Sequence, residues 1–310
     1  MKEFLDVFSV EEKLEPMNCP PMSIHLKPGA IPTYISTPRK IGPSLKPPSK
    51  KELDDMVSKE IIEKVPVDYV TEWCAPFCPR EKESGGIRPT VDFRGLDAWV
   101  QRTAHPQTTP YEAVHNVTPG SRWFTVMDAK NGYHQILLDK EAQDLLCFMT
   151  PWGRYKFLRG PQGFSGTGDK YNYESDKIIA EIPDTSKVVD DILTANIPFP
   201  EHLSRVVEVL QRCRSGGITL SPKKFKFART EVKFVGYIVG RDGIKADPGK
   251  LKAILEYPKP NNIKELRRFD GMVNQMGPFS TELTKARGVI RELRSQKNEF
   301  LWSKDHDEAF

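Results

Sequence analysis

Hydrophobic and polar residues follow two different periods along this chain, and these periods separate strand-forming from helix-forming regions. Between residues 75 and 240, short runs rich in Val, Ile, Phe and Tyr are interrupted by Gly and Pro, a pattern typical of strands joined by turns. The predicted strands are 75–82, 85–93, 123–130, 134–139, 153–159, 224–228 and 232–240, with a further hairpin at 188–193.

Apolar residues recur at helical spacing in other segments, where they would form one buried stripe. The clearest case is 200–217, which has Pro200 at its start, an apolar face and two glycines at its end. The predicted helices are 51–64, 168–182, 200–217, 248–258, 262–276 and 281–296. Strands and helices together predict a mixed α+β fold whose last helices form a separate bundle.

Length and composition narrow the class of protein. With 310 residues, the chain is long enough for two or three subdomains around a substantial core. Residues 1–50 are rich in proline and predict an extended arm without a core of its own. No apolar stretch approaches twenty residues, and the N-terminus lacks the apolar core of a secretory signal, so we expect no membrane partner.

The five cysteines, an odd number, favour a reducing compartment. Cys74 and Cys78 could suggest a metal clip. However, no second Cys or His pair follows at finger-like spacing, so we expect two half-buried thiols rather than structural zinc.

Positive charge is concentrated rather than general, because the net charge is only +4. Residues 221–233 gather five basic side chains around Phe225 and Phe227. Such a segment fits contact with a nucleic-acid backbone. A solvated edge strand guarded by lysines explains it equally well.

Three carboxylates interrupt apolar strands, and they raise the question of what offsets their burial. Asp128 lies near the end of the predicted strand 123–130, and Asp190 and Asp191 lie between Val and Ile residues some sixty positions later. An unpaired carboxylate in such surroundings costs several kcal/mol or more. Mg²⁺ prefers oxygen ligands and would balance the charge. Alternatively, Asp191 points to solvent while Asp190 caps a turn.

Several motifs, in a fixed order, resemble those of reverse transcriptases of long-terminal-repeat retroelements, the Ty3/gypsy-like group. "FTVMDAKNGYHQILLD" resembles the first catalytic motif of that family, "VVDDIL" the second, "GPQGF" the Pro-Gln-Gly element and "IRPTVDFRGLD" the fingers motif. Residues 202–239 resemble the passage from the palm into the primer grip, and 243–276 resemble the entry into the thumb. The resemblance runs from about residue 2 to the end of the chain.

The resemblance implies a right-hand polymerase of class α+β, with a central antiparallel palm sheet and a helical C-terminal thumb. The implied divisions are an extended N-terminal arm (1–50), fingers (51–105 and 140–160), palm (106–139), palm and primer grip (161–238), thumb (239–292) and the start of a connection towards a ribonuclease H (293–310). The chain carries no Asp-Thr/Ser-Gly protease motif and ends where family members continue, so we expect a polymerase module.

The resemblance also implies roles for individual residues. Asp128, Asp190 and Asp191 would be catalytic and would hold two Mg²⁺ ions, for which Mn²⁺ could substitute. The residues that would bind the dNTP are Lys82, Arg88, Ala129, Tyr133 and Gln162. The primer grip would comprise Phe234, Val235, Gly236 and Tyr237. The contacts to the nucleic-acid backbone would come from Lys223, Lys224 and Lys226.

Each of these side chains also has a purely structural interpretation. Arg88 could be a surface arginine on a strand, Tyr133 an ordinary core aromatic and Gln162 a polar turn residue. His134 and His202 are interpreted as packing or surface residues, since a lone histidine seldom signals chemistry.

The chain departs from the family pattern at three places. Val188 stands where an aromatic residue is usual, and the segment 163–179 is more polar than the usual palm helix. Asp270 replaces an apolar residue on a thumb helix, which is unfavourable if the carboxylate is buried.

The predicted function is reverse transcription: RNA- and DNA-templated DNA polymerisation from a primer. The partners would be an RNA template, a DNA primer, an RNA–DNA hybrid and dNTPs, with a monomeric protein in a cytoplasmic retroelement particle or in the nucleus. The alternative is a domesticated or decayed protein that binds template–primer without efficient catalysis. An α+β scaffold with accidental acids is a third interpretation.

Overall fold

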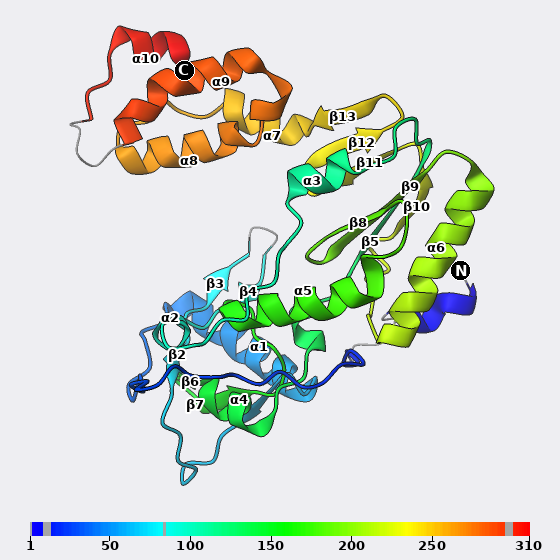
Figure 1. Ribbon diagram of the computed structural model, residues 1–310. Helices are drawn as coiled ribbons and strands as arrows, with labels where there is room; N and C mark the ends of the chain where they lie inside the picture. The colour runs from blue at the N-terminus through cyan, green and yellow to red at the C-terminus, as the bar shows by residue number, and fades with distance from the viewer. Residues whose placement is uncertain (1, 9–13, 83–84, 295–299) are drawn as a thin grey trace.

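The computed structural model describes residues 2–8, 14–82, 85–294 and 300–310, and it has mixed α and β structure. At the N-terminus, η1 (Lys2–Val7) packs against α6 (Phe199–Gly216). The following segment runs along the body of the molecule, where Met22 bridges Leu138 and Leu26 bridges Val100 (Figure 1). Then come η2 (Pro43–Leu45) and α1 (Lys46–Ser58).

A four-stranded sheet of order β1–β7–β6–β2 forms one end of the molecule (Figure 1). Its strands are β1 (Ile62–Lys64), β2 (Ala75–Pro76), β6 (Cys147–Thr150) and β7 (Gly153–Phe157). The helix α4 (Lys140–Leu145) precedes β6, and the two-stranded ribbon β3 (Arg80–Glu81) with β4 (Ile87–Arg88) and the short α2 (Arg94–Asp97) follow β2.

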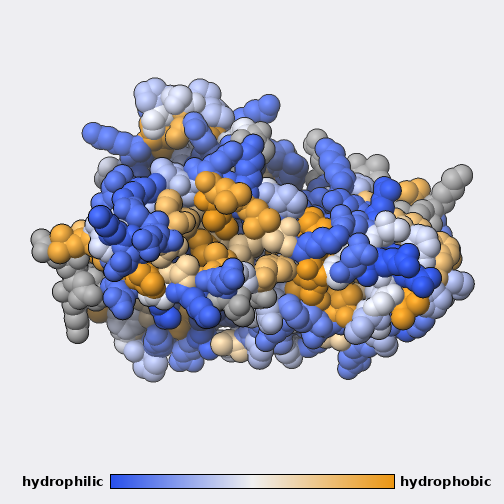
Figure 2. Space-filling model, turned by 90° about the horizontal axis from the view of Figure 1, so that it is seen from above, coloured by the Kyte–Doolittle hydropathy of each residue, from blue (hydrophilic) through white to orange (hydrophobic). Residues whose placement is uncertain are grey.

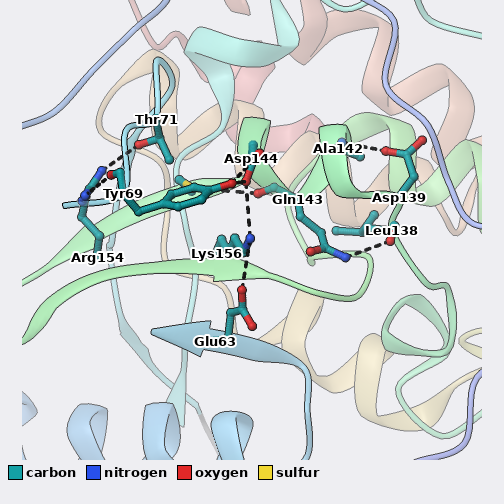
Figure 3. Close-up of polar contacts among 11 residues, drawn as sticks. Glu63, Tyr69, Thr71, Leu138, Asp139, Ala142, Gln143, Asp144, Arg154 and Lys156 are labelled. Atoms are coloured by element: carbon teal, nitrogen blue, oxygen red, sulfur yellow. Dashed lines mark hydrogen bonds and ion pairs between the residues drawn. The ribbon is translucent and has the colours of Figure 1, made fainter. Parts of the chain in front are cut away.

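Polar contacts fasten the loop after β1 to this sheet (Figure 3). The Arg154 guanidinium donates to the Thr71 hydroxyl at 2.9 Å and to the carbonyls of Pro66, Val67 and Tyr69. Lys156 forms ion pairs with Glu63 at 3.1 Å and Asp144 at 3.4 Å. Because Arg154 lies on β7, it ties the loop to the sheet, although Val67 is 99% exposed.

The central sheet has the order β10–β5–β9–β8 and carries the three carboxylates. Its strands are β5 (Trp123–Asp128), β8 (Thr185–Val188), β9 (Asp191–Asn196) and β10 (Lys226–Arg229). Side chains alternate between its faces. Met127 and Ile192 belong to the large core that includes α5 (Ser165–Ile179) and α6 residues, whereas Val126 and Leu193 face a second cluster.

The second cluster joins the central sheet to a smaller one. It contains residues of α3 (Pro110–His115) and of the sheet β11 (Glu231–Phe234), β12 (Tyr237–Gly240) and β13 (Gly243–Ala246). Beyond β13 lies a helical bundle: α7 (Pro248–Leu255), α8 (Ile263–Asn274), η4 (Gly277–Phe279), α9 (Thr281–Arg291), η5 (Glu292–Arg294) and α10 (Lys304–Ala309) (Figure 1).

The bundle has a small core of its own around Leu266, Phe269 and Val273. No residue of α7 is buried, and Leu255 is 85% exposed. Seen from above, apolar residues gather in the middle of the surface between hydrophilic borders (Figure 2).

The structure corrects several sequence predictions. The strand expected at 134–139 is wrong: η3 (Gly132–Gln135) occupies its start, and only isolated bridges follow. The helix expected at 51–64 begins earlier and ends at Ser58, because residues 62–64 pair with β7. The helix expected at 281–296 ends at Arg291, and its last two predicted residues lie outside the described ones.

The buried Asp270 has an explanation that the sequence did not supply. Its side chain is 7% exposed, and its two oxygens accept from Arg287 at 2.7 Å and from Arg294. Two guanidinium groups from the neighbouring α9 and η5 therefore offset a charge that would otherwise be unfavourable there.

Candidate active site

Asp128 and Asp191 lie opposite one another at the ends of two adjacent antiparallel strands. The register of β5 and β9 pairs Asp128 directly with Asp191, and the Ala129 amide donates to the Asp190 carbonyl at 2.8 Å. Asp128 continues the side of β5 that carries Val126, and Asp191 continues the side of β9 that carries Leu193. The two carboxylates therefore share one sheet face, away from α5 and α6.

Asp190 lies in the two-residue turn between β8 and β9. Burial and the nearby charge of Asp128 raise the pKa of its carboxyl to about 6, while Tyr171 opposes the rise. Its Oδ1 atom is buried and has no partner with hydrogen-bonding geometry among the described residues. A buried acceptor without a donor is rare in proteins, so this oxygen is open to a further donor or to a cation.

Gly132 closes over Asp190 and leaves no room for a side chain. A Cβ atom there would lie 2.2 Å from Asp190 Oδ1 and 2.6 Å from the ring of Tyr171. Asn-Gly pairs are typical of turns, so Asn131 and Gly132 could have indicated a close backbone approach at this position. We predicted no role for either residue from the sequence.

The turn itself is strained. Val189 has φ 52°, a conformation that a β-branched residue rarely adopts. Such strain persists only where the surrounding structure enforces it, and it is common at functional sites.

Lys224 supplies the positive charge nearest to the carboxylates. Its ammonium lies 2.6 Å from Asp128 Oδ2, and this contact raises the pKa of Lys224. Burial, followed by the charge of Asp128, raises the pKa of Asp191, and Lys224 lowers it. In the part of the chain that the structure describes, no three His, Cys, Asp or Glu side chains are already arranged around a common metal position.

Three of the predicted nucleotide-binding residues line one polar cavity of about 320 Å³. These are Lys82 and Arg88, from the β3–β4 ribbon, and Gln162, which precedes α5. Lys82 and Arg88 are exposed, so both heads are free to meet an anion.

The cavity has walls that the sequence analysis missed. Glu52 and Asp55 of α1 line it, as do Lys59, which follows the helix, and Asn131. The sequence signal of α1 was only its amphipathic pattern, which does not say what its polar face meets. Ala129 and Tyr133 are not among the lining residues.

Ala129 and Tyr133 lie beneath the carboxylates instead. Ala129 is 3% exposed and acts through its backbone contact to Asp190. The Tyr133 ring meets the Tyr171 ring edge-on at 5.6 Å, and burial together with the charge of Asp190 raises its pKa. Their roles in nucleotide binding stay predictions.

The predicted primer-grip residues form the hairpin turn between β11 and β12. Phe234 and Tyr237 are 1% and 6% exposed, so their rings belong to the second core cluster. Val235 and Gly236 both have positive φ and form the turn. Any contact with a nucleic acid at this turn would therefore come from Val235 and from backbone atoms.

The basic segment 221–233 fits the edge-strand interpretation better than that of a surface whose aromatic rings stack on bases. Lys223 and Lys224 lie in a turn, and Lys226 begins the edge strand β10. Phe225 packs edge-on against Phe8 at 5.1 Å, so its ring is engaged within the protein. Contacts from the three lysines to a nucleic-acid backbone stay predictions.

His202 is a packing residue, as expected, whereas His134 contacts the Gly160 carbonyl at 3.0 Å and also lines the polar cavity. His202 is fully buried and contacts Thr125 at 2.7 Å and Asn196 at 3.0 Å. Burial lowers the pKa of His134 and of His202 to about 4. Cys74 and Cys78 are free thiols, the first buried and the second partly exposed.

Comparison with known proteins identifies the family. Residues 80–239 match the family model described as reverse transcriptase (RNA-dependent DNA polymerase). The chain therefore belongs to the reverse transcriptase family, which confirms the resemblance found in the motifs. Enzymes of this family use divalent metal ions.

Similar curated proteins are transposon polyproteins. The chain is 30% identical over 266 residues to the retrovirus-related Pol polyprotein from transposon opus of Drosophila melanogaster, covering 80% of this chain and 26% of that protein. It is 27% identical over 230 residues to the transposon Tf2-3 polyprotein of Schizosaccharomyces pombe, covering 74% and 17%. The chain thus spans about a quarter or less of the length of these relatives.

Solved structures confirm the right-hand polymerase fold. The foamy viral protease–reverse transcriptase in complex with double-stranded DNA aligns with a TM-score of 0.87 at 21% identity, covering 99% of this chain and 54% of that one. The same viral protein in complex with an RNA/DNA hybrid gives a TM-score of 0.82 at 20% identity, covering 99% and 41%.

Proposed function

We propose that this chain is the polymerase part of a reverse transcriptase, which extends a DNA primer on an RNA or DNA template. The observation that carries the proposal is the position of Asp128, Asp190 and Asp191 next to one another at the end of the central sheet. Family membership and the fold support it. The solved relatives in complex with double-stranded DNA and with an RNA/DNA hybrid support nucleic-acid partners.

The three carboxylates fit divalent metal ions by their chemistry. Their oxygens are the ligands that Mg²⁺ prefers, and Asp190 Oδ1 is a buried acceptor without a donor. Burial and the mutual repulsion of the carboxylates raise the pKa values of Asp190 and Asp191 although Lys224 lies nearby, and a bound cation would relieve that repulsion. When bound, two Mg²⁺ ions would stabilise the attacking and the leaving oxygen of nucleotidyl transfer, and Mn²⁺ could replace them.

The cavity beside the carboxylates suits a nucleoside triphosphate. Arg88 and Lys82 would hold the phosphates, since an arginine fork matches phosphate oxygens and neutralises their charge. Gln162, which lines the same cavity, would contact the nucleotide and the template strand. Tyr133 would lie beneath the sugar and exclude a 2′-hydroxyl.

The subdomains follow from this assignment. The sheet β1–β7–β6–β2 with the β3–β4 ribbon would form the fingers, and the central sheet with α5 and α6 would form the palm. The hairpin β11–β12 would be the primer grip, and α7 to α9 would form the thumb.

Primer extension tests the proposal. The wild-type chain should extend a DNA primer on an RNA template with dNTPs and Mg²⁺, and chelation of the metal should stop the reaction. Asp190→Asn should abolish extension because it replaces the carboxylate by a neutral amide of similar size and shape. Asp242→Asn is the matched control, since the Asp242 side chain is 78% exposed and pairs with Lys245 on the surface.

Template–primer binding separates the two remaining interpretations. Binding that weakens steeply with salt but gives no extension would indicate a protein that only binds nucleic acid. Absence of both would contradict the assignment altogether.

The two arginines around Asp270 argue against decay, because a damaging substitution would not come with its own partners.

A further inference from the structure

A buried lysine lies directly behind the turn that carries Asp190. Lys187 belongs to β8, and its side chain is only 6% exposed. Burial lowers the pKa of its ammonium group, and Asp176 raises it. Long charged side chains are almost never buried so far unless they are paired, so this residue requires an explanation.

The ammonium of Lys187 has an acceptor for each of its three hydrogens. It lies 3.0 Å from Asp176 Oδ1, 3.1 Å from Asn172 Oδ1 and 3.4 Å from the Val189 carbonyl. It also lies 5.8 Å from the centre of the Tyr171 ring. Two of these neighbours belong to the catalytic turn or touch it, since Val189 precedes Asp190 and Tyr171 packs against Asp190.

Two of the polar residues in the segment 163–179 belong to the same network. Asp176 and Asn172 lie on α5 and face β8, where they meet Lys187. His105 contacts the second oxygen of Asp176 at 2.7 Å and so fixes the carboxylate from the outside. Asn172 donates to the Gly168 carbonyl at 2.9 Å, which orients its oxygen towards the lysine.

We propose that Lys187 is a positioning residue: through the Val189 carbonyl and the Tyr171 ring it holds the strained turn so that the Asp190 carboxylate stays beside Asp128. The physical reason is that Val189, at φ 52°, would relax if nothing held its peptide group. Asp176, Asn172 and His105 fix the lysine in turn. The catalytic part of this inference rests on the proposed polymerase function.

Four proteins test it: wild type, Lys187→Met, Lys187→Met with Asp176→Leu, and Lys177→Met as control. Lys177 lies on α5, the helix that carries Asp176. It pairs with Glu174, and its side chain is 50% exposed. The single Lys187 variant leaves Asp176 without its lysine and is expected to lose thermal stability. The double variant replaces the buried charge pair by apolar groups and should regain most of that stability.

The decisive comparison is between stability and rate in the double variant. Its single-turnover extension rate at saturating dNTP should remain roughly 10–100-fold below wild type, as is usual for residues that support a metal-binding group. Its affinity for template–primer should stay within about twofold of wild type, because Lys187 does not reach the surface. A double variant that regains both stability and rate would show that Lys187 is only a packing residue, which overturns the proposal.

A second measurement needs neither metal nor nucleic acid. Amide exchange of residues 188–191 in the double variant should be about tenfold faster than in wild type and in Lys177→Met, because the turn has lost its donor. Exchange at the wild-type rate would overturn the proposal. If the wild type fails to extend a primer but the exchange difference is present, the polymerase function fails while the positioning of the turn stands.

Discussion

Acidification should unfold this protein in part through one buried histidine, His202. It is fully buried and joins α6 to two strands of the central sheet. Its Nδ1 faces the Asn196 carbonyl oxygen, Oδ1, and its Nε2 faces the hydroxyl of Thr125, which already accepts from the Ala228 amide. A neutral ring that donates from Nδ1 and accepts the Thr125 hydroxyl hydrogen at Nε2 satisfies all these contacts, whereas a protonated ring could not accept that hydrogen and would carry a charge into a buried place.

The expected loss of stability follows from the lowered pKa of His202. Burial takes the pKa of His202 from 6.5 to about 4. Above pH 6.5 the ring is neutral in both folded and unfolded chains and adds nothing. As the pH falls below 6.5, the unfolded chain binds a proton that the folded one refuses, so stability is lost. The loss reaches about 2 kcal/mol at pH 5 and about 3 kcal/mol below pH 4.

Urea unfolding followed by circular dichroism measures this effect at pH 7.5 and pH 5. His202→Gln removes the titrating group, so its stability should fall less between these two pH values than that of the wild type, by about 2 kcal/mol. The control, His115→Gln, changes an exposed histidine on α3 and should follow the wild type. Equal losses in wild type and His202→Gln would refute the reasoning. His134, whose pKa burial also lowers, is present in all three proteins and cancels in the comparison.

Three further predictions concern other parts of the molecule. Arg88→Gln should raise KM for the dNTP roughly 10–100-fold in steady-state extension without weakening template–primer binding, since a charge-assisted hydrogen bond contributes about 1.5–3 kcal/mol. An unchanged KM would show that Arg88 does not bind the nucleotide. Asp270→Leu should lower the free energy of unfolding in urea by on the order of 1–3 kcal/mol, less than the loss of a fully buried pair because Arg294 is 37% exposed. Adding Arg287→Met should recover most of that loss. A double variant no more stable than the single one would contradict this account. Arg154→Met should cost about 1–3 kcal/mol and speed amide exchange in the loop 66–71, because the Val67 and Tyr69 carbonyls would lose the guanidinium as donor. Unaltered exchange there would show that the loop holds its path unaided.

The sequence by itself determined the class of fold, the order of motifs and the identity of the acids. The helix 200–217 was predicted within a residue or two of α6, because its apolar period and its end signals are local. The predicted hairpin at 188–193 is also present, because alternating apolar residues around a short turn leave few other conformations. The assigned roles of the nucleotide and primer residues remain predictions that only assays can test.

The tertiary structure alone decided which partners the charged residues meet. Asp270 looked unfavourable in the sequence and is paired with two arginines, and Lys187 drew no attention although it lies behind Asp190. The register that sets Asp128 against Asp191 joins residues far apart in the chain, as does the cavity wall contributed by α1. Local patterns report period and turn chemistry. The energy of a buried charge depends instead on neighbours that only folding brings near, so the sequence could name these residues but not say what stabilises them.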